Sequence, residues 1–226
     1  MHADAIMTSR VVTADPDEEV AVVARRLLDN RISALPVVGH DGRLCGIVSE
    51  GDLMRRAECG RSRSWWLSLM ADETADFRKT LGTRVRDVMT HDVVTVDEET
   101  PIAEIAHILE MKGIKRVPVL RGGRLAGIVS RADLLRALAA IGDRDDVSPS
   151  DDDGQIRARI LALLEQRTTA ALHAVSVIVV NGSVYLWGTA ETQADKDAIR
   201  IAAENVAGVA KVHDFLSTLP EVLRSV

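Results

Sequence analysis

The chain has 226 residues, 46% of them hydrophobic and 27% charged, a composition that indicates a folded globular protein and excludes a disordered chain. The longest apolar run, around residues 174–180, is too short to span a membrane, and the first ten residues lack the pattern of a secretory signal, so we expect a cytoplasmic protein. The net charge of -6 provides no basic face for nucleic acid, and two cysteines are too few for a disulfide framework.

The first predicted elements form a small α+β unit. Residues 11–13 are β-branched and predict a strand, and residues 17–30 carry apolar side chains at helical spacing, which predicts an amphipathic helix. Residues 35–38 and 44–48 predict two strands joined by a turn that contains Asp41 and Gly42. A second helix is expected to begin where the last of these strands ends.

Residues 58–84 predict an inserted helix. Trp65, Trp66, Leu69 and Phe77 fall on one face of that helix, and the simplest interpretation is that this face packs on the rest of the protein. Two adjacent tryptophans are a large apolar area to leave in water, so a lid over a ligand or a surface for a partner is the alternative.

The whole first unit is then repeated. The segment that begins at Met7 matches the segment that begins at Met89 at 12 of 32 aligned positions, and residues 42–55 match residues 123–136 at 10 of 14. The two copies should therefore share one fold of strand, helix, strand, strand and helix. A unit of about 50 residues is small for a core of its own, so we expect the two to bury their sheets against each other about a pseudo-dyad.

The C-terminal third begins with an acidic segment. Residues 142–154 contain six aspartates and one arginine, which predicts a solvated linker. Beyond it we expect a helix over 155–166, strands over 175–180 and 183–188 joined by an Asn-Gly turn, a helix over 192–205, and a strand over 209–216. The inward residues of the two helices should be Ile156, Ile160, Leu163, Leu164, Ala194, Ala198, Ile201 and Ala202.

Three motifs of the repeat resemble those of a known family. They are VMT at 88–90, ALPVV and RVPVL at 34–38 and 116–120, and GIVSEGDL and GIVSRADL at 46–53 and 127–134. The repeat resembles a tandem pair of cystathionine-β-synthase (CBS) domains, the regulatory unit called a Bateman module. The resemblance implies an α+β fold, with one CBS domain over 1–57, the insert over 58–84, and the second domain over 85–141.

The C-terminal region resembles a second family. Its α-β-β-α-β order, with glycines at 182, 188 and 208, is similar to that of the BON domain, which is associated with attachment to membranes or partner proteins. The resemblance implies a BON domain over 155–226, after the acidic linker over 142–154.

Ser49 with Asp52, and Ser130 with Asp133, stand where a strand ends and a helix begins. One interpretation is a helix cap alone. The other follows from the CBS resemblance: the aspartate accepts hydrogen bonds from both ribose hydroxyls of a nucleotide, while the serine and the free helix N–H groups face phosphate. Because an aspartate is expected to reach back to the cap less well than a glutamate, we favour the nucleotide for at least one copy.

Basic residues distinguish the two copies. The second has Lys115, Arg116 and Arg131 where the first has Ser33, Ala34 and Glu50. A phosphorylated ligand should therefore prefer the second site, although an exposed basic edge is the alternative. The family's pattern places Thr13 and Thr95 in the loop that holds base and sugar; β-forming residues of a strand are the alternative. AMP, ADP, ATP and S-adenosylmethionine are the expected ligands, and the sequence does not select among them.

Two functions compete. In the first, the CBS pair senses an adenosine-type nucleotide and the BON domain contacts an unknown protein target. In the second, the CBS pair only dimerises and the BON domain tethers a protein or phospholipid surface. We expect a homodimer through the CBS pair in either case, because two stacked units leave apolar helix faces to be buried.

Catalysis and metal binding have weaker support. The chain has no phosphate-binding loop, dinucleotide fingerprint, zinc-protease motif or nucleophile elbow, and we expect no enzyme. Cys45 falls in a predicted strand and His107 on a predicted helix. His2 with Asp4, and His40 with Asp41, do not make a complete metal-ligand set.

Overall fold

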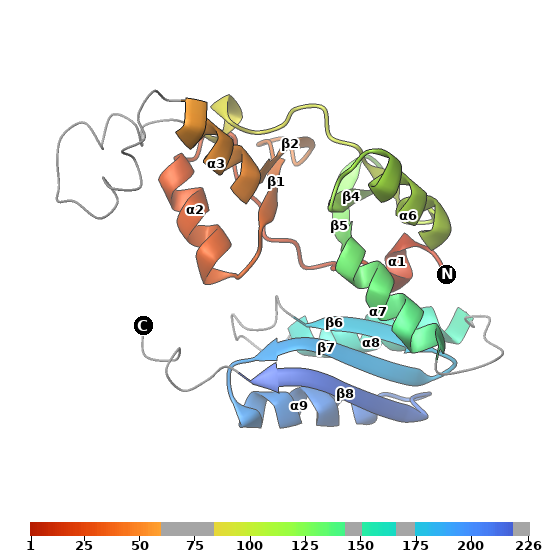
Figure 1. Ribbon diagram of the computed structural model, residues 1–226. Helices are drawn as coiled ribbons and strands as arrows, with labels where there is room; N and C mark the ends of the chain where they lie inside the picture. The colour runs from red at the N-terminus through yellow and green to blue at the C-terminus, as the bar shows by residue number, and fades with distance from the viewer. Residues whose placement is uncertain (60–83, 143–150, 166–174, 219–226) are drawn as a thin grey trace. The chain divides into compact units, whose positions relative to one another are not determined.

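The computed structural model describes residues 1–59, 84–142, 151–165 and 175–218, and all statements about structure below concern these residues (Figure 1). They form two compact units. One comprises the described residues within Met1–Arg10, Val96–Val119 and Gly127–Val226, and the other comprises those within Val11–Thr95 and Leu120–Ala126. The helix expected around Trp65, Trp66, Leu69 and Phe77 lies outside the described residues.

The first repeat contains a hairpin between two helices. Its elements are α2 (Val20–Asp29), β1 (Ala34–Val38), β2 (Leu44–Ser49) and α3 (Glu50–Cys59). β1 and β2 pair antiparallel, and the turn between them contains Gly42 at a φ of 77°. Val23 and Leu27 of α2 pack with Leu35, Val37 and Val48 of the hairpin in one buried cluster. The prediction of a helix and a hairpin here is confirmed.

The strand predicted over residues 11–13 is not formed as a regular strand. A single parallel bridge joins Ala14 to Val37: the Ala14 N–H donates to the Pro36 carbonyl (3.0 Å), and the Val38 N–H donates to the Ala14 carbonyl (2.9 Å). The next bond of a parallel ladder would need an N–H from Pro36, and proline has none. The pairing therefore stops, and Thr13 lies in the loop before it.

The helix predicted over residues 17–30 begins at Val20. The preceding acids form a local turn instead, in which the Asp15 N–H donates to Glu18 Oε2 (2.9 Å) and the Asp17 N–H donates to Asp15 Oδ1 (2.8 Å). Short acidic side chains favour such turns over a helical start because they hydrogen-bond nearby backbone.

The second repeat has the same helices and hairpin in the same order, preceded by a short strand where the first repeat has only a bridge. They are β3 (Val96–Asp97), α6 (Ile102–Met111), β4 (Arg116–Arg121), β5 (Arg124–Ser130) and α7 (Arg131–Gly142). The sheet order is β3-β4-β5. β3 begins at Val96, the counterpart of Ala14, so Thr95 precedes the strand just as Thr13 precedes the bridge.

The segment that leads into each repeat pairs with the other repeat. Thr8 exchanges two backbone hydrogen bonds with Ile128 of β5, at 2.9 and 3.0 Å. Thr90 exchanges the matching two with Ile47 of β2, also at 2.9 and 3.0 Å. The short helices before these residues, α1 (Ala3–Ile6) and η1 (Val85–Asp87), occupy corresponding positions. The two repeats are thus joined by a reciprocal exchange.

A glycine makes room for each exchanged segment. A Cβ atom on Gly127 would lie 2.4 Å from Met7 Sδ, and a Cβ atom on Gly46 would lie 2.4 Å from Met89 Sδ. Real Cβ atoms do not approach other atoms so closely, so any other residue would push the methionine away. This contact explains why both strands carry a glycine between apolar residues.

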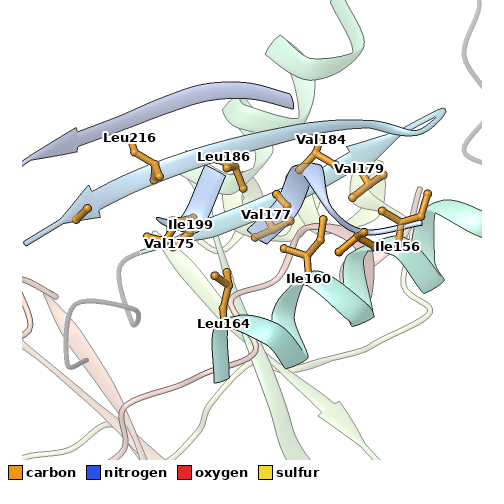
Figure 2. Close-up of a cluster of buried hydrophobic side chains, with 13 residues drawn as sticks. Ile156, Ile160, Leu164, Val175, Val177, Val179, Val184, Leu186, Ile199 and Leu216 are labelled. Atoms are coloured by element: carbon orange, nitrogen blue, oxygen red, sulfur yellow. The ribbon is translucent and has the colours of Figure 1, made fainter. Parts of the chain in front are cut away.

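The C-terminal module has the expected α-β-β-α-β order: α8 (Asp151–Glu165), β6 (Ser176–Val180), β7 (Ser183–Ala190), α9 (Gln193–Glu204) and β8 (Lys211–Thr218). β7 pairs antiparallel with β6 and parallel with β8. Asn181 and Gly182 have φ values of 48° and 72°, as the predicted type I′ turn requires. Figure 2 shows the core, in which Ile156, Ile160 and Leu164 of α8 meet the sheet.

Two predictions about this module were wrong. Residues 151–154, assigned to the solvated linker, belong to α8, and Asp153 is buried because its carboxylate accepts from the Asn181 N–H (2.7 Å) and the Gly182 N–H (2.8 Å). The inner face of α9 is formed by Ile199 and Ala203, while Ile201 is exposed. Leu163 of α8 is exposed as well.

None of the described helices combines the length and apolar character that a membrane crossing needs.

Candidate functional site

In each repeat, the serine at the end of the hairpin and the aspartate three residues later form the same set of hydrogen bonds. We call this arrangement the Ser-x-x-Asp box. In the first repeat, Asp52 Oδ2 accepts from the Ser49 N–H (2.9 Å) and from Ser49 Oγ (2.6 Å). In the second, Asp133 Oδ2 accepts from the Ser130 N–H (2.8 Å) and from Ser130 Oγ (2.7 Å). The expectation that aspartate reaches back poorly was therefore wrong, since both carboxylates close the box at full hydrogen-bond strength.

A third box occurs at the start of α9. Asp195 Oδ2 accepts from the Thr192 N–H (3.1 Å) and from Thr192 Oγ1 (2.6 Å), and the Asp195 N–H donates to Thr192 Oγ1 (3.0 Å). It follows that the box by itself stabilises a helix start and does not indicate a ligand. A nucleotide role must rest on what surrounds each box.

The surroundings differ between the repeats. Asp133 is only 3% exposed, and its Oδ1 accepts from Arg136 Nη1 at 2.7 Å, so both of its oxygens are engaged within the protein. Asp52 is half-buried. A ribose hydroxyl would have to compete with Arg136 to reach Asp133.

Among the basic residues of the second repeat, Arg131 hydrogen-bonds to backbone carbonyls of the protein. The exposed Arg131 donates from Nε to the Ile114 carbonyl (3.1 Å) and from Nη2 to the Leu109 carbonyl (3.0 Å), near the C-terminal end of α6. A guanidinium there offsets the partial negative charge of the helix end. Lys115 is exposed, and Arg116 is half-buried at the start of β4.

An ion pair holds the loop that contains Thr13. Arg26 donates from Nη1 to the Thr13 carbonyl (2.7 Å) and to Glu18 Oε2 (2.9 Å), and from Nη2 to Glu18 Oε1 (2.5 Å). The hydrogen bonds from Arg26 lower the pKa of Glu18, so this ion pair persists to a lower pH than the ordinary pKa of a glutamate would allow. Thr13 and Thr95 are both half-buried.

The remaining reactive side chains show no catalytic arrangement in the part of the chain that the structure describes. Cys45 Sγ lies 3.3 Å from the Val37 carbonyl, and burial raises the pKa of this thiol, which disfavours the thiolate. His40 faces Asp15 (3.4 Å) and Asp17 (3.9 Å) rather than Asp41. Arg86 lies 2.7 Å from Asp17, so a protein cation already balances this acidic pair.

The family models match both parts of the chain. The model for the CBS domain matches residues 3–58 and 85–140, and the model for the BON domain matches residues 152–220. The chain is a tandem CBS-domain protein with a C-terminal BON domain. The BON match begins inside the predicted acidic linker, in agreement with the helical start of α8 at Asp151.

Similar proteins match about three fifths of the chain. MJ1426 of Methanocaldococcus jannaschii is 32% identical over 149 residues, which is 59% of this chain and 88% of that protein. The chain spans only 31% of MJ1404 and 46% of MJ1225 from the same organism.

Two solved structures resemble the fold. CBSX2 in complex with AMP has a TM-score of 0.51 and 26% identity, over 62% of this chain and 98% of that chain. MJ1225 from Methanocaldococcus jannaschii has a TM-score of 0.52 and 28% identity, over 61% of this chain and 47% of that chain.

Sequence reasoning missed two arginines near the second box. Arg136 follows Asp133 by three residues on α7, a spacing that places both side chains on one helix face and could have been noticed. Arg157 of the BON domain is buried between Ile156 and Ile160, and a cation on an apolar helix face is the only signal that the sequence offers.

Proposed function

We propose that this protein is a non-enzymatic regulator whose CBS pair binds an adenosine-type nucleotide and whose BON domain conveys the bound state to a partner. A box alone does not indicate a ligand; what carries the proposal is that the two Ser-x-x-Asp boxes stand at matching strand–helix junctions of a CBS pair whose fold is similar to that of CBSX2, solved in complex with AMP. In the proposed complex, Asp52 or Asp133 accepts hydrogen bonds from the ribose, and the helix start faces phosphate.

The proposal includes a ranking of the two sites. The sequence ranks the second site first because of Lys115, Arg116 and Arg131. We now favour the first repeat in the arrangement described, because Asp52 is half-buried whereas Asp133 is only 3% exposed. Glu50 beside the first box disfavours a polyphosphate, so S-adenosylmethionine and AMP are better candidates there than ATP.

A thermal-shift screen with AMP, ADP, ATP and S-adenosylmethionine tests the nucleotide. A ligand at 100 times its dissociation constant should stabilise the protein by about 2.7 kcal/mol. Replacing both Asp52 and Asp133 by alanine should weaken binding at least about tenfold, because each loses hydrogen bonds of about 1.5 to 3 kcal/mol to the ribose. Asp195→Ala, which opens the same kind of box in the BON domain, should lower stability by about 1 kcal/mol and leave affinity unchanged.

Equal affinity in the wild type and the double variant would remove the ribose role from both boxes and reduce them to helix caps. Absence of a shift with every ligand in the wild type would remove the nucleotide altogether.

A second candidate function, an adaptor that dimerises through the CBS pair, is favoured by one observation. α7 exposes Leu135 and Leu138, 67% and 65% accessible, one turn apart on the same face. Large apolar side chains clustered on a helix face favour burial against a second copy. The partner of the BON domain, a protein or a phospholipid surface, would then be tethered without nucleotide control.

The homodimer can be tested on the full chain. Replacing Leu135 and Leu138 together by glutamate should convert the protein to a monomer in sedimentation velocity at tens of micromolar, because four charges would meet in an apolar contact. Ile201→Glu, which alters an exposed apolar residue of α9, should leave the dimer intact. If the double variant sediments as the wild type does, the dimer does not use this face of α7.

A further inference from the structure

Strand β6 of the BON sheet is covered on both faces. Val177 and Val179 of β6 belong to the core beneath α8 and α9, and by strand alternation Ile178 and Val180 point the opposite way. Ile178 and Val180 are nevertheless fully buried. The elements that contact β6 on that side are α1 and α7, both within the same compact unit as the BON domain (Figure 1). β6 therefore rests on α7 of the second repeat and on α1, whose segment pairs with that repeat.

The contacting face of α7 begins with the candidate ribose ligand. Its buried residues are Asp133, Ala137 and Ala140, at positions one and two helical turns apart. The two alanines let a sheet approach closely. The corresponding residues of the first repeat are Asp52, Arg56 and Cys59, so the first repeat lacks this small-residue face.

A buried cation joins the two parts. Arg157 of α8 donates from Nε to the Val177 carbonyl (2.9 Å) and from Nη2 to the Met7 carbonyl (2.6 Å), so it ties the BON sheet to the exchanged segment on β5. Burial lowers the pKa of Arg157 to about 10, although the negative charges of Asp4 and Asp133 oppose the change. The guanidinium stays charged at neutral pH, held between backbone carbonyls and two acids.

The first repeat serves as an internal control. Met7 is 5% exposed and Ile6 is fully buried, whereas their counterparts Met89 and Val88 are half-buried. Asp133 is likewise more buried than its counterpart Asp52. All three differences fall at the residues that border the BON sheet or Arg157, so the contact with the BON domain accounts for them.

We infer that the BON domain covers the nucleotide site of the second repeat in the same chain, and that Arg157 stabilises this closed form. In the closed form Asp133 is out of reach of a ribose, and binding there requires the sheet to leave α1 and α7. Nucleotide binding at the second site and BON contact with α7 thus exclude each other. Binding of the nucleotide would therefore release the BON domain from α7. The inference rests on the proposed nucleotide function.

Calorimetry with AMP on the full chain tests the cover. In an Asp52→Ala background only the second site remains, and adding Arg157→Met should strengthen AMP binding at least about tenfold if the closed form holds nine molecules in ten or more. Methionine keeps the apolar stem and removes the donors. The matched control is Arg159→Ala, an exposed arginine two residues along α8, which should leave the affinity of the Asp52→Ala protein unchanged.

Equal AMP affinity with and without Arg157→Met, while the wild type binds AMP, would overturn the cover and leave the proposed function standing. No AMP binding in any variant, Arg157→Met included, would overturn both. Amide hydrogen exchange tests the cover without a substitution at Arg157. In the Asp52→Ala protein, saturating AMP should speed the exchange of residues 6–8 and 176–180. Unchanged exchange with AMP bound at Asp133 would also overturn the cover.

Discussion

Gly127→Ala should lower the free energy of unfolding by about 1 to 3 kcal/mol, the usual cost of overpacking a core. A Cβ atom there would lie 2.4 Å from Met7 Sδ, 2.8 Å from Met7 Cγ and 3.0 Å from the Thr8 carbonyl oxygen. Met7 is 5% exposed and has little room to move. Urea denaturation followed by circular dichroism measures the change.

The repeat supplies a matched control. Gly46→Ala creates the same clash with Met89, but Met89 is half-buried and can shift toward solvent, so the cost should be smaller. Met7→Ala should relieve the clash at Gly127, which makes the double variant more stable than the sum of the single changes predicts. Equal costs at the two glycines, or simple additivity with Met7→Ala, would refute the packing that we describe.

Asp153→Ala should destabilise the BON domain by about 3 kcal/mol, because it leaves two backbone N–H groups in the hairpin turn without their charged acceptor. Asp153 is 4% exposed, and the N–H groups of Asn181 and Gly182 donate to its two oxygens. Both turn residues have positive φ, a conformation that the carboxylate helps to hold. Thermal and urea unfolding of the full chain report the change.

Its neighbour Asp152 is exposed and provides the control, since Asp152→Ala should change stability by no more than about 0.5 kcal/mol. The loss of stability in Asp153→Asn should lie between those of Asp152→Ala and Asp153→Ala, because the carboxamide keeps one neutral acceptor. If Asp152 and Asp153 behaved alike, residues 151–154 would be solvated, as their composition first indicated.

The sequence predicted the parts of the fold that local chemistry decides. The repeat located both hairpins, Asn181-Gly182 located the type I′ turn, and the helix expected over 192–205 is α9 with Thr192 at its cap. The prediction of a strand over 11–13 was wrong because continued pairing needs an N–H from Pro36, which lies on a different strand and has none. The predicted inner face of α9 was wrong because alanine is too small to indicate clearly which face of a helix is buried.

The candidate site was located but its surroundings were not. The position of both Ser-x-x-Asp boxes followed from the sequence, since a strand end and a helix start are local features. The sequence did not predict that Arg131 hydrogen-bonds carbonyls at the end of α6. Arg157 lies 150 residues from Met7 in the chain, a distance over which spacing carries no information.

The reciprocal exchange has a consequence for synthesis on the ribosome. Thr8 obtains its backbone partner only when Ile128 has been made, 120 residues later. At about 5 to 20 residues per second, the segment around Met7 waits for about 6 to 24 seconds with its apolar side chains uncovered. The first repeat waits in the same way for Thr90. Nascent chains should therefore engage a chaperone until the second repeat emerges, and the two repeats should acquire protection from hydrogen exchange together rather than in order of translation.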